Sequence, residues 1–414
     1  MYVLLAIIGA AIGALINACV YSLGEKKSAI SPWITASQQT ARTWIHRLPV
    51  IGWLNRDAEA SELGKRFWLR PLFIELTWII GLPFFYFWIF SDGLTGGVAA
   101  PANWHFPWFV GHSILFAFLF VATFIDFDQR IIPDSITLPG TLIALLLAAL
   151  WPSFRLPQLV PGLVGMKVES VDFADGAALP TWHMGSTGLL IAIAIYLIWI
   201  VALLPKYPLT ELNCIGLKRV WVSTIRLLQY NGLKVRAKTR RLGWMYLGIG
   251  MLGAILIAVA WTWMTPQYWN SLFGAVVGLG LGGISIWLVR IVASHSLGQE
   301  AMGFGDVTLM AMIGAFLGWQ AALITFAVSP FAALAIVLVC FLITKENELA
   351  FGPYLCAGAM ITIFWWSSIW PKMLLQFFIS PMILLGVLSF SLVLLMVMML
   401  GIRMVKAGAS GSHS

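Results

Sequence analysis

The most constraining feature of this sequence is a series of long apolar runs that carry almost no charge. Runs of about 17–25 apolar residues are long enough to cross a bilayer as helices. The runs lie at 2–23, 72–90, 108–127, 187–204, 244–264, 271–292, 321–343, 354–370 and 381–400. Two shorter runs, at 136–151 and 307–319, are flanked closely by polar motifs. The sequence therefore predicts an all-α, polytopic integral membrane protein with about 9–11 transmembrane helices.

Composition excludes the other broad classes of protein. The chain is 60% hydrophobic and only 10% charged, whereas soluble domains are about 45–50% apolar and about 25% charged. A soluble enzyme, a secreted scaffold and a disordered chain are thereby excluded. A membrane β-barrel is disfavoured because the apolar residues are continuous and do not alternate.

Two local features refine the assignment of spans. The first run begins at Met1 without a basic segment and contains Asn17, so we interpret it as a retained span rather than a signal peptide. Residues 306–343 would form a single helix of about 56 Å at about 1.5 Å per residue, so a break is predicted near Gly318-Trp319-Gln320. The four cysteines are scattered without a CxxC pair, which predicts neither a disulfide framework nor a metal site.

The basic residues predict the orientation of the chain. Of the 25 Lys and Arg residues, eight lie in segment 24–71 and nine in segment 205–243, which together make seventeen. The positive-inside rule places both segments in the cytoplasm and the N-terminus outside. Segments 91–107 and 152–186 are then external. Topology and contact with anionic lipid explain the basic segments, and nucleic-acid binding is not expected.

An acidic motif closes one apolar run and opens the next. It reads Ile125-Asp126-Phe127-Asp128-Gln129-Arg130-Ile131-Ile132-Pro133-Asp134. Asp134 is placed as an N-cap or first-turn acid of the following helix, and Asp128 is expected to be solvated or paired with Arg130. Asp126 lies deepest in the apolar run, where an ionisable side chain is a functional candidate by default.

A second acid follows a glycine pair on the same predicted side of the membrane. In Gly303-Phe304-Gly305-Asp306 the two glycines allow a tight turn against a neighbouring helix. Asp306 alone would be an ordinary helix cap. Two poorly hydrated aspartates brought together would instead share one proton and act on a peptide bond as base and acid. No HExxH or GxSxG motif offers another hydrolytic route, and His105 and His112 belong to the external side, where helix-boundary roles are expected.

With these two motifs the chain resembles the type IV prepilin peptidases, which are GxGD-type intramembrane aspartyl proteases of bacteria. Further blocks are similar to that family in the expected order. They are Gly13–Tyr21, Leu48–Leu54, Arg70–Leu76 and Phe351-Gly352-Pro353-Tyr354. The resemblance implies that Asp126 and Asp306 are the catalytic pair, with Gly303, Gly305, Asp134, Phe351, Gly352 and Pro353 as supporting motif residues.

The resemblance also implies a substrate, partners and a location. The substrate would be the basic leader of type IV prepilins or type II secretion pseudopilins, cut at the cytoplasmic face of the bacterial inner membrane. The lipid bilayer is a direct partner, and the pilus or secretion machinery an indirect one. Proteolysis needs no cofactor or metal. S-adenosylmethionine is implied only where N-methylation is retained, and the absence of cysteines from segment 24–71, where relatives carry two CxxC pairs, leaves that activity open although Glu75 is present.

The expected organisation has three parts. Residues 1–90 form the N-terminal region with its cysteine-free cytoplasmic loop, residues 108–400 the peptidase core with a basic insertion at 205–243, and residues 401–414 a tail. Two other interpretations remain open. One is a secondary transporter that uses two intramembrane acids, although no repeated halves are evident, and the other is an inactive homologue of the peptidases.

Overall fold

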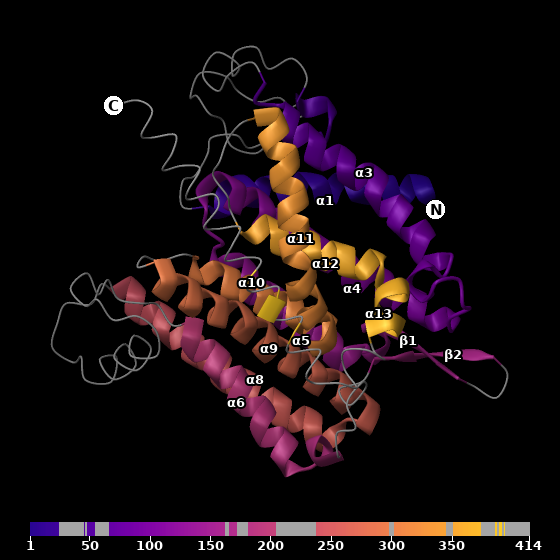
Figure 1. Ribbon diagram of the computed structural model, residues 1–414, viewed down its shortest axis with the longest axis vertical. Helices are drawn as coiled ribbons and strands as arrows, with labels where there is room; N and C mark the ends of the chain where they lie inside the picture. Colours follow the sequence, from indigo (N-terminus) through magenta and orange to yellow (C-terminus); the bar gives the residue numbers. More distant parts are fainter. Residues whose placement is uncertain are drawn as a thin grey trace.

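The computed structural model describes residues 1–24, 45, 48–53, 66–161, 165–171, 181–203, 237–297, 302–344 and 351–373, with four single positions between 386 and 393. Helices dominate these ranges (Figure 1). They are α1 (Tyr2–Leu23), α3 (Leu69–Phe90), α4 (Ala102–Gln129), α5 (Asp134–Leu150), α6 (Ser186–Leu203), α8 (Ala237–Trp263), α9 (Pro266–Leu297), α10 (Phe304–Leu317), α11 (Trp319–Thr344), α12 (Gly352–Phe364) and α13 (Trp366–Met373). Seven are long and apolar enough to span a bilayer, and α5, α10 and α12 are shorter apolar helices. The prediction of an all-α polytopic membrane protein is confirmed.

The first two helices pack closely because glycines line their contact. A side chain at Gly9 would place its Cβ within 2.3 Å of the Trp78 carbonyl oxygen, and one at Gly13 would lie 2.8 Å from the Glu75 Cα. Asn17, on the same helix, donates to the carbonyl oxygen of Pro71 at 3.0 Å. The predicted first span at 2–23 is thus a full helix whose partner is α3 (Figure 1).

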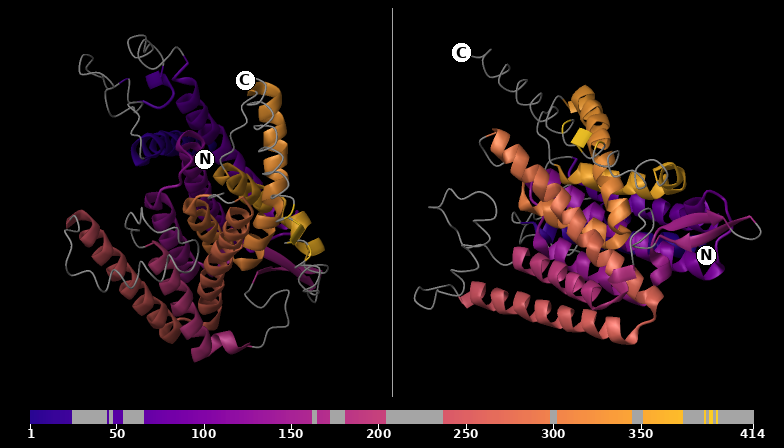
Figure 2. Two further views of the ribbon diagram at one scale, coloured as in Figure 1. Left: turned by 60° about the vertical axis from the view of Figure 1, so that its left-hand side comes forward. Right: turned by 60° about the horizontal axis from the view of Figure 1, so that its bottom comes forward.

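The centre of the molecule is α10, a short helix that is buried from Asp306 to Leu317. It packs against α9, α5, α11, α12 and α4. The contact with α9 again depends on glycine, since a Cβ at Gly278 would lie 2.1 Å from the Gly314 carbonyl oxygen and one at Gly314 would lie 2.0 Å from that of Gly278. Such small-residue contacts let membrane helices approach closely. The helices α6 and α8 lie side by side at the edge of this core (Figures 1 and 2).

The break predicted near Gly318-Trp319-Gln320 is confirmed, because α10 ends at Leu317 and α11 begins at Trp319. Gly318 adopts φ +88, and a Cβ there would also lie 2.0 Å from an Arg155 guanidinium nitrogen. Arg155 itself is buried and donates to the carbonyl oxygen of Ser271 at 3.0 Å. A glycine is therefore required at this position for two independent reasons.

The prediction of one continuous span at 354–370 is wrong. The chain forms α12, which ends at Phe364, and the separate helix α13, with Trp365 between them in a non-helical conformation. Trp366 and Trp370 of α13 stack at 5.0 Å, and Trp366 donates its indole N–H to the Pro157 carbonyl oxygen at 2.6 Å. Tertiary contacts of these indoles hold α13 beside β1 rather than in line with α12. The run predicted at 381–400 lies outside the described ranges apart from four single positions.

The predicted external segment 152–186 contains an antiparallel hairpin that the helical sequence pattern does not reveal. Its strands are β1 (Pro157–Pro161) and β2 (Met166–Ser170) (Figure 1). Leu159 lies opposite Val168 in their register. The hairpin follows the C-terminal end of α5, opposite the end at which α5 begins with Asp134.

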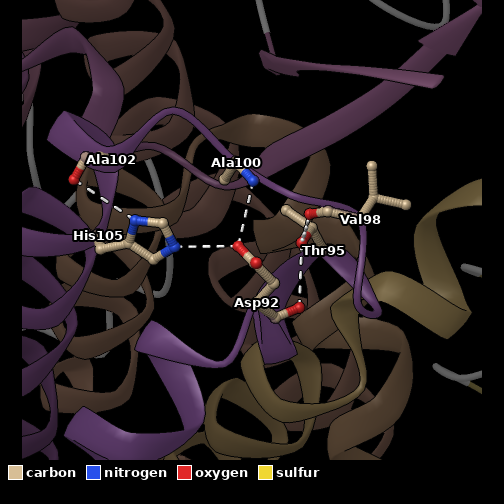
Figure 3. A network of polar contacts seen from close by, with 6 residues as sticks. All are labelled: Asp92, Thr95, Val98, Ala100, Ala102 and His105. Atoms are coloured by element: carbon tan, nitrogen blue, oxygen red, sulfur yellow. Dashed lines mark hydrogen bonds and ion pairs between the residues drawn. The ribbon is translucent and has the colours of Figure 1, made fainter. Parts of the chain in front are cut away.

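A polar network holds the turn between α3 and α4 (Figure 3). Asp92, at φ +55, accepts a hydrogen bond from the Ala100 backbone N–H at 3.1 Å, and its carboxylate lies 2.9 Å from Nε2 of His105. His105 thus has the helix-boundary role that was predicted. His112 is buried inside α4, where its Nδ1 lies 2.8 Å from the Trp108 carbonyl oxygen, so it is not at a boundary.

Candidate active site

Asp126 is placed by the last turn of α4. The helix ends at Gln129, and Arg130 follows at φ +55, donating its backbone N–H to the Asp126 carbonyl oxygen at 2.8 Å. A residue in the left-handed conformation commonly ends an α-helix. Arg130 turns the chain sharply, so that the segment ending in Pro133 leads directly into α5. The Asp126 side chain points into the protein, and the residue is only 4% exposed.

Asp306 is placed by the first turn of α10, whose N-cap is Gly303. Gly305 packs against the chain that follows Asp126, since a Cβ there would lie 2.8 Å from the Ile132 carbonyl oxygen and 2.9 Å from the Ile132 Cβ. The second glycine of the motif is therefore required by close approach. Gly303 is not, because it has φ −66 and an added Cβ would meet no atom closer than 3.8 Å. The predicted tight turn depends on Gly305 alone.

The third motif completes the site from α12. The Gly352 backbone N–H donates to Oδ2 of Asp126 at 2.9 Å. A Cβ at Gly352 would lie 2.6 Å from that oxygen and 2.8 Å from the Ile132 Cδ1. Phe351 is the N-cap of this helix and contacts Tyr354 edge-on, while Pro353 occupies its first turn, where a missing N–H costs nothing. Three sequence motifs that are far apart in the chain thus meet at Asp126.

The two carboxylates lie close enough to repel one another electrostatically. Both are buried, with Asp306 only 7% exposed. Asp126 faces the charge of Arg130, and Asp306 faces that of Arg290, whose guanidinium lies 5.6 Å from the centre of the Phe304 ring. Two like charges in a buried site cannot both be present cheaply, so such a pair holds one proton between them.

Sequence analysis missed one residue of the site, Cys356. Its buried thiol hydrogen-bonds with Thr123 and interacts electrostatically with both Asp126 and Asp306. Cys356 follows Gly352 by one helical turn and therefore lies on the same face of α12. That spacing was the available signal, but it becomes informative only once Gly352 is known to contact Asp126.

The other acids of the first motif have structural surroundings. Asp128 was predicted to be solvated or paired with Arg130; its side chain is 36% exposed, and it pairs with Arg70 of α3 at 2.5 Å. The same guanidinium donates to the Phe124 carbonyl oxygen at 2.8 Å. Asp134 is the first-turn acid of α5, as predicted, and interacts electrostatically with Tyr246. Neither residue is placed beside Asp306 by any contact among the described residues.

A second buried carboxylate, Glu75, lies in α3 and serves a different purpose. It accepts hydrogen bonds from Asn17 at 3.0 Å, from the Trp53 indole at 2.9 Å and from the Val50 backbone N–H at 2.5 Å. These donors come from α1 and from residues 48–53, so Glu75 ties the described part of the first loop to both helices. Within the described ranges, no group of three His, Cys, Asp or Glu side chains is arranged to hold a metal ion.

Comparison with known proteins finds a local similarity to one family. The sequence profile of the Type IV leader peptidase family matches residues 238–339, which include Asp306 but not Asp126. This part of the chain is similar to the type IV leader peptidases. The similarity to known members of this family is local, and the profile match does not extend to Asp126.

Three relatives show the extent of the similarity, each a prepilin leader peptidase/N-methyltransferase. The protein of Pseudomonas putida is 28% identical over 40% of this chain and 60% of its own length. That of Pectobacterium carotovorum subsp. carotovorum is 40% identical over 22% of this chain and 33% of its own length. That of Pseudomonas aeruginosa is 36% identical over 24% of this chain and 34% of its own length. The chain thus spans 60% or less of each relative, and no solved structure matches it.

Proposed function

We propose that the chain is an intramembrane aspartyl endopeptidase that removes the leader of type IV prepilins or type II secretion pseudopilins. The observation that carries the proposal is the convergence of Asp126 and Asp306 in one buried site, with the Gly352 N–H on Asp126. Two carboxylates that share a proton can activate a water molecule and protonate the departing amine. The relatives named above support the substrate class.

The location proposed for this reaction is the cytoplasmic face of the bacterial inner membrane, with the N-terminus outside. The distribution of Lys and Arg supports this orientation, since seventeen of 25 lie in segments 24–71 and 205–243. The site is built by the C-terminal end of α4 and the N-terminal ends of α10 and α12. The charge distribution predicts that all three helix ends lie on the cytoplasmic side. A single-span substrate would reach the site laterally from the bilayer.

N-methylation of the processed pilin is not included in the proposal. The relatives carry that activity in their names, but the first loop here has no cysteine and the Glu75 carboxylate is engaged by Asn17, Val50 and Trp53. Mass spectrometry of the mature pilin N-terminus after processing would reveal the addition of a methyl group.

The decisive experiment is co-expression of a prepilin with the wild type and with separate Asp126→Asn and Asp306→Asn variants. Leader removal is followed as a gel shift, and membrane insertion of each variant by fractionation. We expect cleavage by the wild type and its complete loss in both variants, because an amide can neither take a proton from water nor donate one as an acid. Asp128→Asn is the matched control, since Asp128 pairs with Arg70 at the surface and should leave cleavage largely intact.

Cleavage by either active-site variant would overturn the assignment of the pair. Failure of the wild type on several prepilins would instead favour an inactive homologue or a transporter, and proton-coupled uptake into proteoliposomes would then identify the transporter.

A further inference from the structure

The two carboxylates of the candidate active site are not equivalent. Oδ2 of Asp126 accepts the Gly352 N–H at 2.9 Å, and that N–H belongs to the first residue of α12. The N-terminal end of a helix carries a partial positive charge. Because Pro353 has no N–H, Gly352 supplies the donor at this point of the helix. Arg130 adds a full positive charge near the same carboxylate.

Asp306 has a different environment. Its Oδ1 is buried without a hydrogen-bond partner among the described residues. Neither carboxylate oxygen of Asp126 is both buried and without a hydrogen-bond partner among the described residues. Asp306 does face Arg290 and a backbone hydrogen bond from Gly303, which both favour its charged form. Its burial and the repulsion from Asp126 disfavour the charged form. Cys356, which interacts electrostatically with both acids, adds no positive charge. An ionised carboxylate that leaves one oxygen unsatisfied in a buried site is costly.

We propose that the shared proton resides on Asp306 and that Asp126 is ionised, with Gly352 as the residue that positions the Asp126 carboxylate through its backbone N–H. This assignment rests on the proposed function only in naming the two acids as catalytic. The difference in protonation belongs to the site itself, so it can be measured with or without a substrate.

The assignment gives each acid one role in peptide hydrolysis. Asp126 takes a proton from water as the water oxygen bonds to the scissile carbonyl carbon, and Asp306 gives its proton to the carbonyl oxygen. In the second step the C–N bond breaks, the amine nitrogen receives the proton held by Asp126, and one hydroxyl of the intermediate returns a proton to Asp306. One water is consumed, and both acids end in their starting states.

Infrared difference spectroscopy on the full-length protein in nanodiscs tests where the proton is. The protonated carboxyl group gives a C=O stretching band that an ionised carboxylate lacks. We expect the band at neutral pH in the wild type, its loss in Asp306→Asn and its retention in Asp126→Asn. Loss in Asp126→Asn with retention in Asp306→Asn would reverse the assignment, and equal behaviour of the two variants or no band in the wild type would also overturn it.

Gly352→Ala tests the positioning role, because the new Cβ would lie 2.6 Å from Oδ2 of Asp126 and force the carboxylate away from its donor. We expect kcat on prepilin to fall by about tenfold or more, with little change in KM, since a hydrogen bond to a charged group is lost. The acidic limb of the pH–rate profile should move to higher pH. Gly81→Ala, in α3, is the matched control, since an added Cβ at that position meets no atom within 4 Å.

An equal loss of activity at every pH would show that Gly352 acts only on packing and would overturn its positioning role. If the wild type cleaves no prepilin, the proposed function fails while the infrared result still decides the location of the proton. If the wild type cleaves and the C=O band is lost in Asp126→Asn but retained in Asp306→Asn, the proposed function stands and the assignment of the proton to Asp306 fails.

Discussion

At the residue scale, the described buried carboxylates form two centres with different partners. Among the described residues, Asp126 has one backbone donor and interacts electrostatically with a second acid. Glu75 accepts hydrogen bonds from Asn17, Val50 and Trp53 and is 1% exposed. A fully bonded buried carboxylate stabilises a fold, and an incompletely bonded pair is typical of a reactive site.

Replacing Glu75 should therefore reduce stability more than it reduces the intrinsic rate of cleavage. In Glu75→Gln the amide loses the charge that three donors face, and we expect a loss of about 1–3 kcal/mol in unfolding free energy. Thermal unfolding in detergent measures it. Glu169→Gln is the control, because its pair with Lys167 lies at the surface and should contribute little. Equal melting temperatures for the two variants would contradict the structural role of Glu75.

Cys356 lies beside both acids, and its substitution tests how closely the site is packed. Cys356→Ala removes the sulfur that hydrogen-bonds with Thr123 and interacts electrostatically with Asp126 and Asp306, leaving a small cavity. We expect it to retain cleavage, because no step requires the thiol. Cys356→Phe should abolish cleavage by displacing the carboxylates, since overpacking a buried position forces neighbours to move. Processing of a prepilin by both variants checks this, and an active Cys356→Phe protein would show that the thiol faces away from the reacting atoms.

At the element scale, glycine contacts decide where α10 lies and hence where Asp306 is held. Gly278→Ala would drive a Cβ to 2.1 Å from the Gly314 carbonyl oxygen, so one helix must shift. We expect destabilisation of about 1–3 kcal/mol and a loss of cleavage, because Asp306 begins the displaced helix. Gly248→Ala, in α8 with no atom within 4 Å of the added Cβ, should be neutral or slightly stabilising. Similar melting temperatures for both variants would contradict the close contact.

Most of the helices could be predicted from the sequence because apolar length alone defines a membrane span. The break at Gly318 followed from length, and the positions of Asp126 and Asp306 followed from their motifs. The split at Trp365 could not be predicted, since it depends on Trp366 reaching Pro157 of a distant hairpin. The pairing of Asp128 with Arg70, 58 positions away, was missed for the same reason. Contacts between remote segments leave no periodic signal.

At the scale of the whole molecule, the orientation in the membrane remains a prediction from charge. Alkaline phosphatase fused after a residue of segment 91–107 should be active, because that segment is expected outside, and a fusion within segment 205–243 should be inactive. Enzyme activity in intact cells gives the result, with equal expression of both fusions as the control. The reverse pattern would place the candidate active site on the outer face and exclude cytoplasmic processing.

The hydrogen bond from Gly352 to Asp126 joins residues 226 positions apart. During synthesis at about 5–20 residues per second, α4 would wait on the order of tens of seconds before α12 emerged. The nascent chain therefore lacks a complete active site throughout its insertion. The candidate active site therefore cannot act on other helices that enter the bilayer beside it until α12 has been inserted.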